Sequence, residues 1–137
     1  MSIQLDIVTP EKKIFSDTVE DVYLPTLLGE TGVLQGHTAL VTPLEPGELR
    51  YKQNGQYKEF AIGEGFLETT DKAVTVLTDL CASSDDIDEN AVEEAMKRAE
   101  EALAGVDHAQ DPDAVIALQA TIAKQLAQLK LKRKYRA

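Results

Sequence analysis

The sequence is poor in cysteine and aromatic residues, and it contains no tryptophan. Its one cysteine, Cys81, excludes an intramolecular disulfide and a zinc site built from several cysteines. Its longest stretch without strongly polar residues, about Val22 to Leu28, is far shorter than the ~20 residues that a membrane-spanning helix needs. The first residues show neither the basic nor the apolar region of a secretory signal, so we expect a chain that stays in the cytosol.

Positive charge is also scarce, and it is unevenly distributed. The chain carries 24 Asp and Glu against 14 Lys and Arg, and this net charge of −10 disfavours a general nucleic-acid binder. An acidic chain with a basic end indicates that this end meets something acidic. A solvated helix end with cations at its negative pole is an equally good interpretation. Residues 124–137 contain no acid and six basic residues: Lys124, Lys130, Lys132, Arg133, Lys134 and Arg136.

The first 84 residues have the pattern of β-strands. Apolar and polar residues alternate from Ile3 to Ile7, and a second β-rich run, Thr18 to Leu24, is expected to end at Pro25. Asn54-Gly55 lies between two further runs and is a strong signal for a hairpin. Seven of the eight glycines and four of the five prolines precede residue 70, as many short strands require. We therefore predict an antiparallel β-sandwich or closed barrel over residues 1–84.

A polar linker, Ser83 to Asp86, separates this part from a helical one. The first helix begins after a cap at either Asp86 or Asp88 and ends at Gly105. Asp111-Pro112 then combines a capping residue with a proline suited to the first helical position. Two helices joined by a short loop predict an antiparallel hairpin over residues 87–137, and hence an α+β protein with two parts.

The apolar residues of the predicted hairpin are small on one helix and large on the other. Because alanine buries little area, the hairpin is expected to be marginal alone and to lean on the sandwich or on a partner. A fixed helical appendage is equally compatible with this pattern. The residues expected to face each other are Ala91, Ala95, Ala99 and Ala102 on the first helix, and Val115, Leu118, Ile122, Leu126 and Leu129 on the second.

No catalytic constellation stands out in the sequence. His37 and His108 lie in different segments, and the glycine-containing segments 29–32 and 63–65 lack the remaining residues of a phosphate-binding loop. We therefore predict a protein that is not an enzyme and that needs no cofactor or metal. One class of function is a stand-alone binding module, but such a module would be expected to expose aromatic anchors, which are scarce here. Another class is a small nucleotide sensor.

Several motifs follow one another in a fixed order over about residues 3–134, nearly the whole chain. Together they closely resemble the epsilon subunit of F-type ATP synthases. One departure is Gln35, where that family usually has proline, so this segment is expected to be looser. The segments that carry the resemblance are Leu24-Pro25, Gly29-Glu30-Thr31-Gly32, Gly36-His37, Pro46-Gly47, Gly65-Phe66-Leu67-Glu68, Val74-Thr75-Val76-Leu77 and Asp86-Ile87-Asp88.

This resemblance implies a non-catalytic rotor subunit in the central stalk of the enzyme. In that family the β-sandwich contacts the gamma subunit and the polar loops of the membrane rotor ring. The helical hairpin folds beside the sandwich or extends toward the catalytic head, where it obstructs ATP hydrolysis. The implied location is peripheral, at the cytoplasmic face of a bacterial membrane or at the stromal face of a photosynthetic one. Whether protons or sodium ions drive the enzyme is decided outside this subunit.

Carried over by position, Glu30, Val33 and His37 fall where the family contacts the rotor ring and the stalk. Glycines around them favour tight turns that project Glu30 and His37 from one rim loop. The alternative is that Glu30 is only solvated and that His37 packs against its own loop.

Two further family traits concern the helical part. Some members bind ATP through a motif that Ile87 and Asp88 match, but Ala91 and Val92 stand where arginine and alanine are expected. Since the guanidinium that would grip phosphate is missing, Asp88 is expected to be a helix cap, and ATP at most a weak regulatory ligand. The basic end, with Lys130, Lys132, Arg133, Lys134 and Arg136, matches the cations that the family presents to an acidic segment of the catalytic beta subunit.

Overall fold

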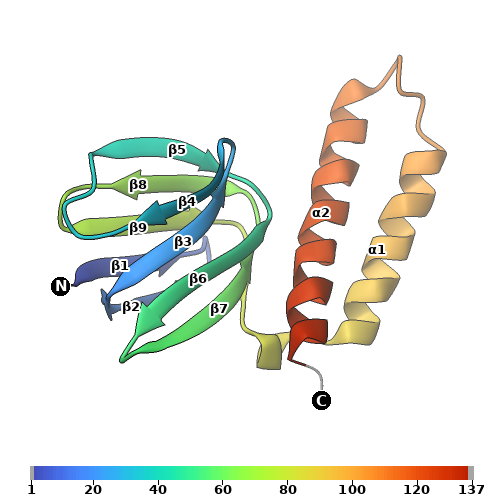
Figure 1. Ribbon diagram of the computed structural model, residues 1–137. Coiled ribbons are helices and arrows are strands. Elements are labelled where there is room, and N and C mark those ends of the chain that lie inside the picture. Colours follow the sequence, from blue (N-terminus) through green and yellow to red (C-terminus); the bar gives the residue numbers. More distant parts are fainter. Residues whose placement is uncertain (1, 136–137) are drawn as a thin grey trace.

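The computed structural model describes residues 2–135, which form a β-sandwich followed by two helices (Figure 1). The strands lie in one continuous sheet in the order β10-β7-β6-β3-β5-β8-β9-β1-β2, with β4 added beside β3, and this sheet folds over a common core. The strands are β1 (Ile3–Val8), β2 (Lys13–Val19), β3 (Asp21–Thr26), β4 (Gly29–Val33), β5 (Leu40–Leu44), β6 (Gly47–Gln53), β7 (Gln56–Ile62), β8 (Gly65–Thr69), β9 (Ala73–Thr78) and β10 (Cys81–Ala82). A short 3-10 helix, η1 (Ser84–Asp86), leads to helices α1 (Glu89–Ala104) and α2 (Pro112–Lys134).

The expected sandwich is confirmed, but it is not antiparallel throughout. Strand β1 pairs with β9 in parallel, with Gln4 opposite Ala73 and Val8 opposite Leu77. A parallel pair needs a long connection, which all the intervening strands supply here. The alternation of apolar and polar residues is the same in both kinds of pairing, so the sequence pattern could not reveal this one.

The second β-rich run of the sequence divides into two strands, and Pro25 does not end it. Pro25 lies inside β3, opposite Glu30 of β4. On its other side, β3 changes partner from β6, at Tyr23, to β5, at Thr26. Proline cannot donate to a ladder, so it is tolerated where the ladder is interrupted. The Asn54-Gly55 hairpin between β6 and β7 is as predicted, with φ angles of 53° and 76°.

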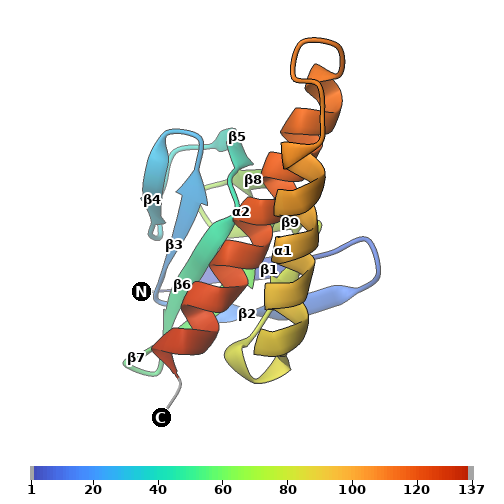
Figure 2. The same ribbon diagram turned by 90° about the vertical axis from the view of Figure 1, so that its right-hand side faces the viewer.

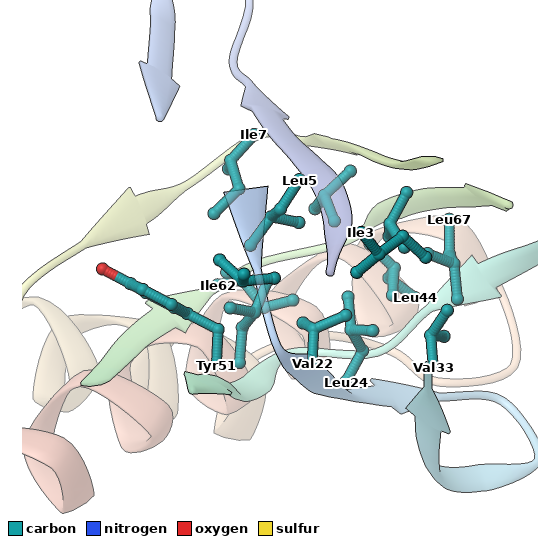
Figure 3. Close-up of a cluster of buried hydrophobic side chains, with 14 residues drawn as sticks. Ile3, Leu5, Ile7, Val22, Leu24, Val33, Leu44, Tyr51, Ile62 and Leu67 are labelled. Atoms are coloured by element: carbon teal, nitrogen blue, oxygen red, sulfur yellow. The ribbon is translucent and has the colours of Figure 1, made fainter. Parts of the chain in front are cut away.

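The sandwich encloses one apolar core, which Figure 3 shows. The alternation predicted at the start of the chain is borne out, because Ile3, Leu5 and Ile7 point into this core while the residues between them do not. A second, smaller cluster joins the sandwich to the helices. Its buried members are Ala61, Ile87, Val92, Leu129 and Leu131.

The helices form the predicted hairpin, with α2 between α1 and the sandwich (Figures 1 and 2). Asp88 caps α1 by accepting a hydrogen bond from the Ala91 amide at 3.1 Å, whereas Asp86 lies in η1, so the alternative of a cap at Asp86 is wrong. Gly105 follows the last residue of α1, and Asp111 caps α2, as predicted.

The predicted faces of the hairpin are only partly correct. On α1, Ala99 is buried, but Ala91 and Ala102 are exposed, and Val92 is buried instead. On α2, Leu126 is exposed, while Ala127, Leu129 and Leu131 are buried. The reason is that α2 contacts α1 on one side and strands β6 and β7 on the other. Two contacts on one helix bury residues that a single helical stripe does not include.

Gly65 lies where the chain approaches β9 most closely. A methyl group at this position would overlap the backbone carbonyl of Leu77. We therefore expect Gly65→Ala to lower the free energy of unfolding by about 1–3 kcal/mol or more, measured by urea denaturation. Gly105→Ala is the matched control, because its added methyl would meet only ordinary contacts, the nearest at 3.7 Å. Equal stability of the two variants would contradict the close approach.

Candidate functional site

Glu30 is exposed on β4, and its carboxylate is paired rather than merely solvated. It lies 3.8 Å from the guanidinium of Arg50, a long and open ion pair that contributes little stability. That guanidinium lies over the rings of Tyr23 and Tyr57, at 4.8 Å and 5.0 Å from their centroids. Stacking on two rings holds Arg50 in place. Glu30 is therefore oriented by a neighbour and still accessible to a partner.

His37 agrees with the interpretation in which the ring packs against its own segment. Its Nδ1 donates to the carbonyl oxygen of Thr38 at 2.8 Å and lies 3.4 Å from the hydroxyl of Thr69. The residue is half-buried. The Gly36 amide beside it donates to the Asp71 carbonyl in the turn between β8 and β9.

The structure does not place Glu30 and His37 on one rim loop. Residues 29–33 form β4, which leads from the β3–β4 turn beside α2 to the opposite end of the sandwich (Figure 1). Glu30 lines a groove of about 430 Å³ together with Leu126 and Lys130 of α2. His37 contacts the far end of β8 instead. The predicted common loop is wrong, because the glycines lie within or beside a paired strand and not in one turn.

Val33 was expected to contact a partner, and this prediction is wrong for the present structure. Its side chain is 0% exposed and packs in the sandwich core with Val22 and Leu24 (Figure 3). Val33 ends β4 opposite Val22, and the alternation of the strand turns it inward. A buried side chain supports the shape of this edge but does not touch a partner.

An apolar row that the sequence pattern did not single out crosses four strands of the sandwich, and its members are exposed except Val8, which is half-buried. Pro43 on β5 lies opposite Phe66 on β8, which lies opposite Leu77 on β9, which in turn lies opposite Val8 on β1. Phe66 is 55% exposed and Leu77 is 44% exposed. Contiguous apolar surface of this kind typically marks a protein interface. The sequence indicates this row only by apolar residues at the outward positions of strands whose alternate positions hold the buried residues.

The basic end of the chain binds the protein's own acidic groups. Arg133 lies 3.0 Å from Glu89 and 2.8 Å from Glu93, both on α1. Lys134 lies 3.1 Å from Glu48 and 2.7 Å from Glu59, both on the sandwich. The basic end therefore meets acidic groups, as one interpretation of the sequence expects, but in this structure they belong to the chain itself; for Arg133 and Lys134, a merely solvated helix end does not describe the arrangement. Arg136, also predicted to contact a partner, lies outside the described residues.

Two other cations complete the arrangement of this helix end. Lys132 donates to the Ser84 carbonyl of η1 at 3.0 Å, so its charge is also directed at the chain itself. Lys130 is exposed beside the groove that contains Glu30.

The electrostatics of this helix end follow from its partners. Hydrogen bonds to Glu59 and Glu48 raise the pKa of Lys134. Burial alone would raise the pKa of Glu59, but hydrogen bonds from Lys134 and Tyr135 outweigh burial and lower it. Both carboxylate oxygens of Glu59 are occupied, since Tyr135 donates its hydroxyl to the second one at 3.1 Å. The charged form of each partner is therefore favoured at neutral pH.

The two residues that match the nucleotide motif have structural roles here. Ile87 is buried in the cluster between sandwich and helices, and Asp88 caps α1. The amide that Asp88 binds belongs to Ala91, the position where the motif expects arginine.

Burial raises the pKa of the Cys81 thiol to about 12, so the thiol is protonated at neutral pH. Among residues 2–135, no three His, Cys, Asp or Glu side chains gather as a metal site would require. Neither of the two described helices is long and apolar enough to cross a membrane.

Comparison with solved structures places the fold among ATP synthase subunits. A chain in the mitochondrial ATP synthase of Euglena gracilis has a TM-score of 0.76 at 24% identity, over 92% of this chain and 78% of that chain. A chain of the central stalk and c-ring of the Tetrahymena thermophila mitochondrial enzyme has a TM-score of 0.57 at 15% identity, over 98% and 96% of the two chains. At these identities the likeness shows the fold alone.

Sequence relatives are closer. Residues 2–83 match the family described as the beta-sandwich domain of the ATP synthase Delta/Epsilon chain. The ATP synthase epsilon chain of Herpetosiphon aurantiacus is 41% identical over 97% of this chain and 99% of the relative. That of Nitrosococcus oceani is 41% identical over 95% and 91%. By domain match, by identity along nearly the whole length and by fold, this chain belongs to the ATP synthase epsilon-chain family.

Proposed function

We propose that this chain is a non-catalytic rotor subunit of an ATP synthase, which couples the membrane ring to the catalytic head and restrains ATP hydrolysis. The observation that carries the proposal is the 41% identity to epsilon chains along both the sandwich and the hairpin. A regulatory hairpin attached to a rigid sandwich suits a part that transmits torque and changes state. The chain would lie peripherally at the cytoplasmic face of a bacterial membrane, or at the stromal face of a photosynthetic one.

The sandwich offers separate surfaces for the partners that this function requires. The row formed by Pro43, Phe66, Leu77 and Val8 supports contact with a gamma-type stalk subunit, because exposed aliphatic and aromatic side chains pack well against a helix of another chain. Glu30 remains a candidate for contact with polar loops of the rotor ring.

The hairpin is the regulatory part of the proposal. When it extends, the helix end that carries Lys130, Lys132, Arg133 and Lys134 would reach an acidic surface of the catalytic beta subunit, and Lys134 would be released from the carboxylates of the sandwich for that contact. Their contacts would be weakened by salt, as those of exposed charges are. No cofactor is required for this role, and ATP would be at most a weak regulatory ligand.

The division of labour between the two parts can be tested by truncation after Asp86. Fourteen buried residues form the sandwich core without any contribution from the helices, so we expect residues 1–86 to fold. The truncated protein should co-elute with a gamma-type subunit and support ATP synthesis in a reconstituted enzyme, with ATP hydrolysis increased. A folded truncated protein that does not bind the stalk would contradict the proposed division.

The apolar row predicts which side chains hold the stalk subunit. We expect Phe66→Ser with Leu77→Ser to weaken binding to a gamma-type subunit by about 30-fold or more, as loss of a central interface contact does. Because both side chains are largely exposed, the fold should be retained, which circular dichroism would check. Ile116→Ser on α2 is the control, since that residue is 64% exposed and lies outside the row. Binding unchanged by the double substitution would place the interface elsewhere.

Nucleotide binding gives a further prediction. With Ala91 in place of arginine and the Asp88 carboxylate engaged as a helix cap, ATP should bind weakly or undetectably in calorimetry. Asp88→Asn keeps a capping side chain but removes the charge. A micromolar affinity for ATP corresponds to about −8 kcal/mol. If the chain bound ATP this tightly and Asp88→Asn abolished the binding, the interpretation of Asp88 as a cap alone would be overturned.

A further inference from the structure

The contact between hairpin and sandwich has a charged edge formed by Lys134, Glu48 and Glu59. Glu48 on β6 lies opposite Ala61 on β7, and Glu59 lies two residues before Ala61 on the same strand. All three side chains are therefore on the outward face of the sheet, against which α2 packs. Lys134 is the last residue of α2, and its ammonium reaches both carboxylates, at 3.1 Å and 2.7 Å. One cation thus bridges two strands of the sandwich at the end of the docked helix.

Glu59 is the covered partner of this pair. Its side chain is only 9% exposed, against 49% for Lys134. A buried carboxylate that loses its cation destabilises the structure that buries it, whereas the same carboxylate in open water is solvated and carries no such penalty. Because Lys134 of α2 and Tyr135 directly after it both hydrogen-bond to Glu59, the docked position contributes to this cover, and Glu59 without Lys134 would disfavour that position.

Arg133 performs a different task one residue earlier. It connects α2 to Glu89 and Glu93, which are one turn apart at the start of α1. All three residues belong to the hairpin and would move with it. Arg133 therefore closes the base of the hairpin, while Lys134 ties the hairpin to the sandwich.

The apolar contact beneath these charges is small. On the sandwich side its buried member is Ala61, and on α2 it is formed mainly by Leu129 and Leu131. Burial of so few large side chains contributes modestly, because the stabilisation is proportional to the apolar area removed from water. The ionic contacts at the edge, together with the pair that Lys124 of α2 forms with Asp79 at 3.0 Å, therefore add to this apolar contact in keeping the hairpin docked.

We propose that Lys134, with Glu59 and Glu48, is a latch that holds the helical hairpin against the sandwich, and that the latch must open before this cation can bind an acidic partner. Lys134 then acts in both positions of the hairpin: it stabilises the docked hairpin through these carboxylates and the extended hairpin through a partner. Neutralising Lys134 removes both effects at once. Neutralising Glu59 removes only the first, so the sandwich-side substitution separates them.

The latch can be measured in the isolated full-length chain, so its failure would leave the proposed function untouched. Ala127 is buried on α2 beside the sandwich, and Ala127→Cys in a Cys81→Ser background provides a thiol that reacts when the hairpin undocks. The rate of thiol labelling then reports the undocked fraction even when that fraction is small. In low salt, Glu59→Gln and Lys134→Gln should each raise the rate about tenfold, as loss of a hydrogen bond between charged groups does.

Controls distinguish the latch from general effects of charge. Glu68→Gln changes the net charge equally, but Glu68 is exposed on β8, away from α2, and should leave the labelling rate unchanged. Exchanging the charges, Glu59→Lys with Lys134→Glu, should restore slow labelling. High salt should accelerate labelling of the wild-type background and reduce its difference from Glu59→Gln. Equal rates for Glu59→Gln, Lys134→Gln and the wild-type background in low salt would overturn the proposal.

Discussion

The structure depends on the position of α2, which packs against α1 on one side and against β6 and β7 on the other. Ala61 makes this possible, because a small side chain on the outer face of β7 lets the helix lie close to the sheet, where Leu129 and Leu131 cover it. The helix therefore cannot present a single apolar stripe. This explains why Leu126 is exposed although it has the spacing of a buried residue.

The distribution of charge follows from the same contact. The chain is strongly acidic, whereas its last 14 residues hold six of its 14 lysines and arginines, and three of these lie in the last turn of α2. In that position they interact favourably with the negative end of the helix dipole, and Arg133 and Lys134 pair with carboxylates of α1 and the sandwich. A helix end that satisfies its charge internally can exchange those partners for external ones at a modest cost, which is what a regulatory segment requires.

Residues along each strand of the sandwich alternate between the core, which stabilises the fold, and the surface, which is free to contact a partner. Inward residues such as Val33 and Leu67 build the core, and the outward neighbours of the same strands, such as Phe66, remain on the surface. Gly65 allows β8 to approach β9 closely, so that Phe66 and Leu77 lie side by side. The rigidity of the core is what allows the exposed row to keep one shape.

The sequence by itself determined the features that depend on neighbours along the chain. These are the strand alternation from Ile3, the hairpin at Asn54-Gly55, the cap at Asp111 and the division into sandwich and helices. It also carried the family resemblance. Each of these has a local physical cause, in side-chain period, backbone conformation or capping, and a local pattern therefore predicts it.

The tertiary structure alone decided the contacts between distant segments. It paired β1 with β9 in parallel, buried Val33 and separated Glu30 from His37. It also directed Lys134 to Glu48 and Glu59, which are 86 and 75 residues away in the chain. Charge and hydrophobicity are properties of single residues, whereas the partner of a charge is set by how the whole chain packs.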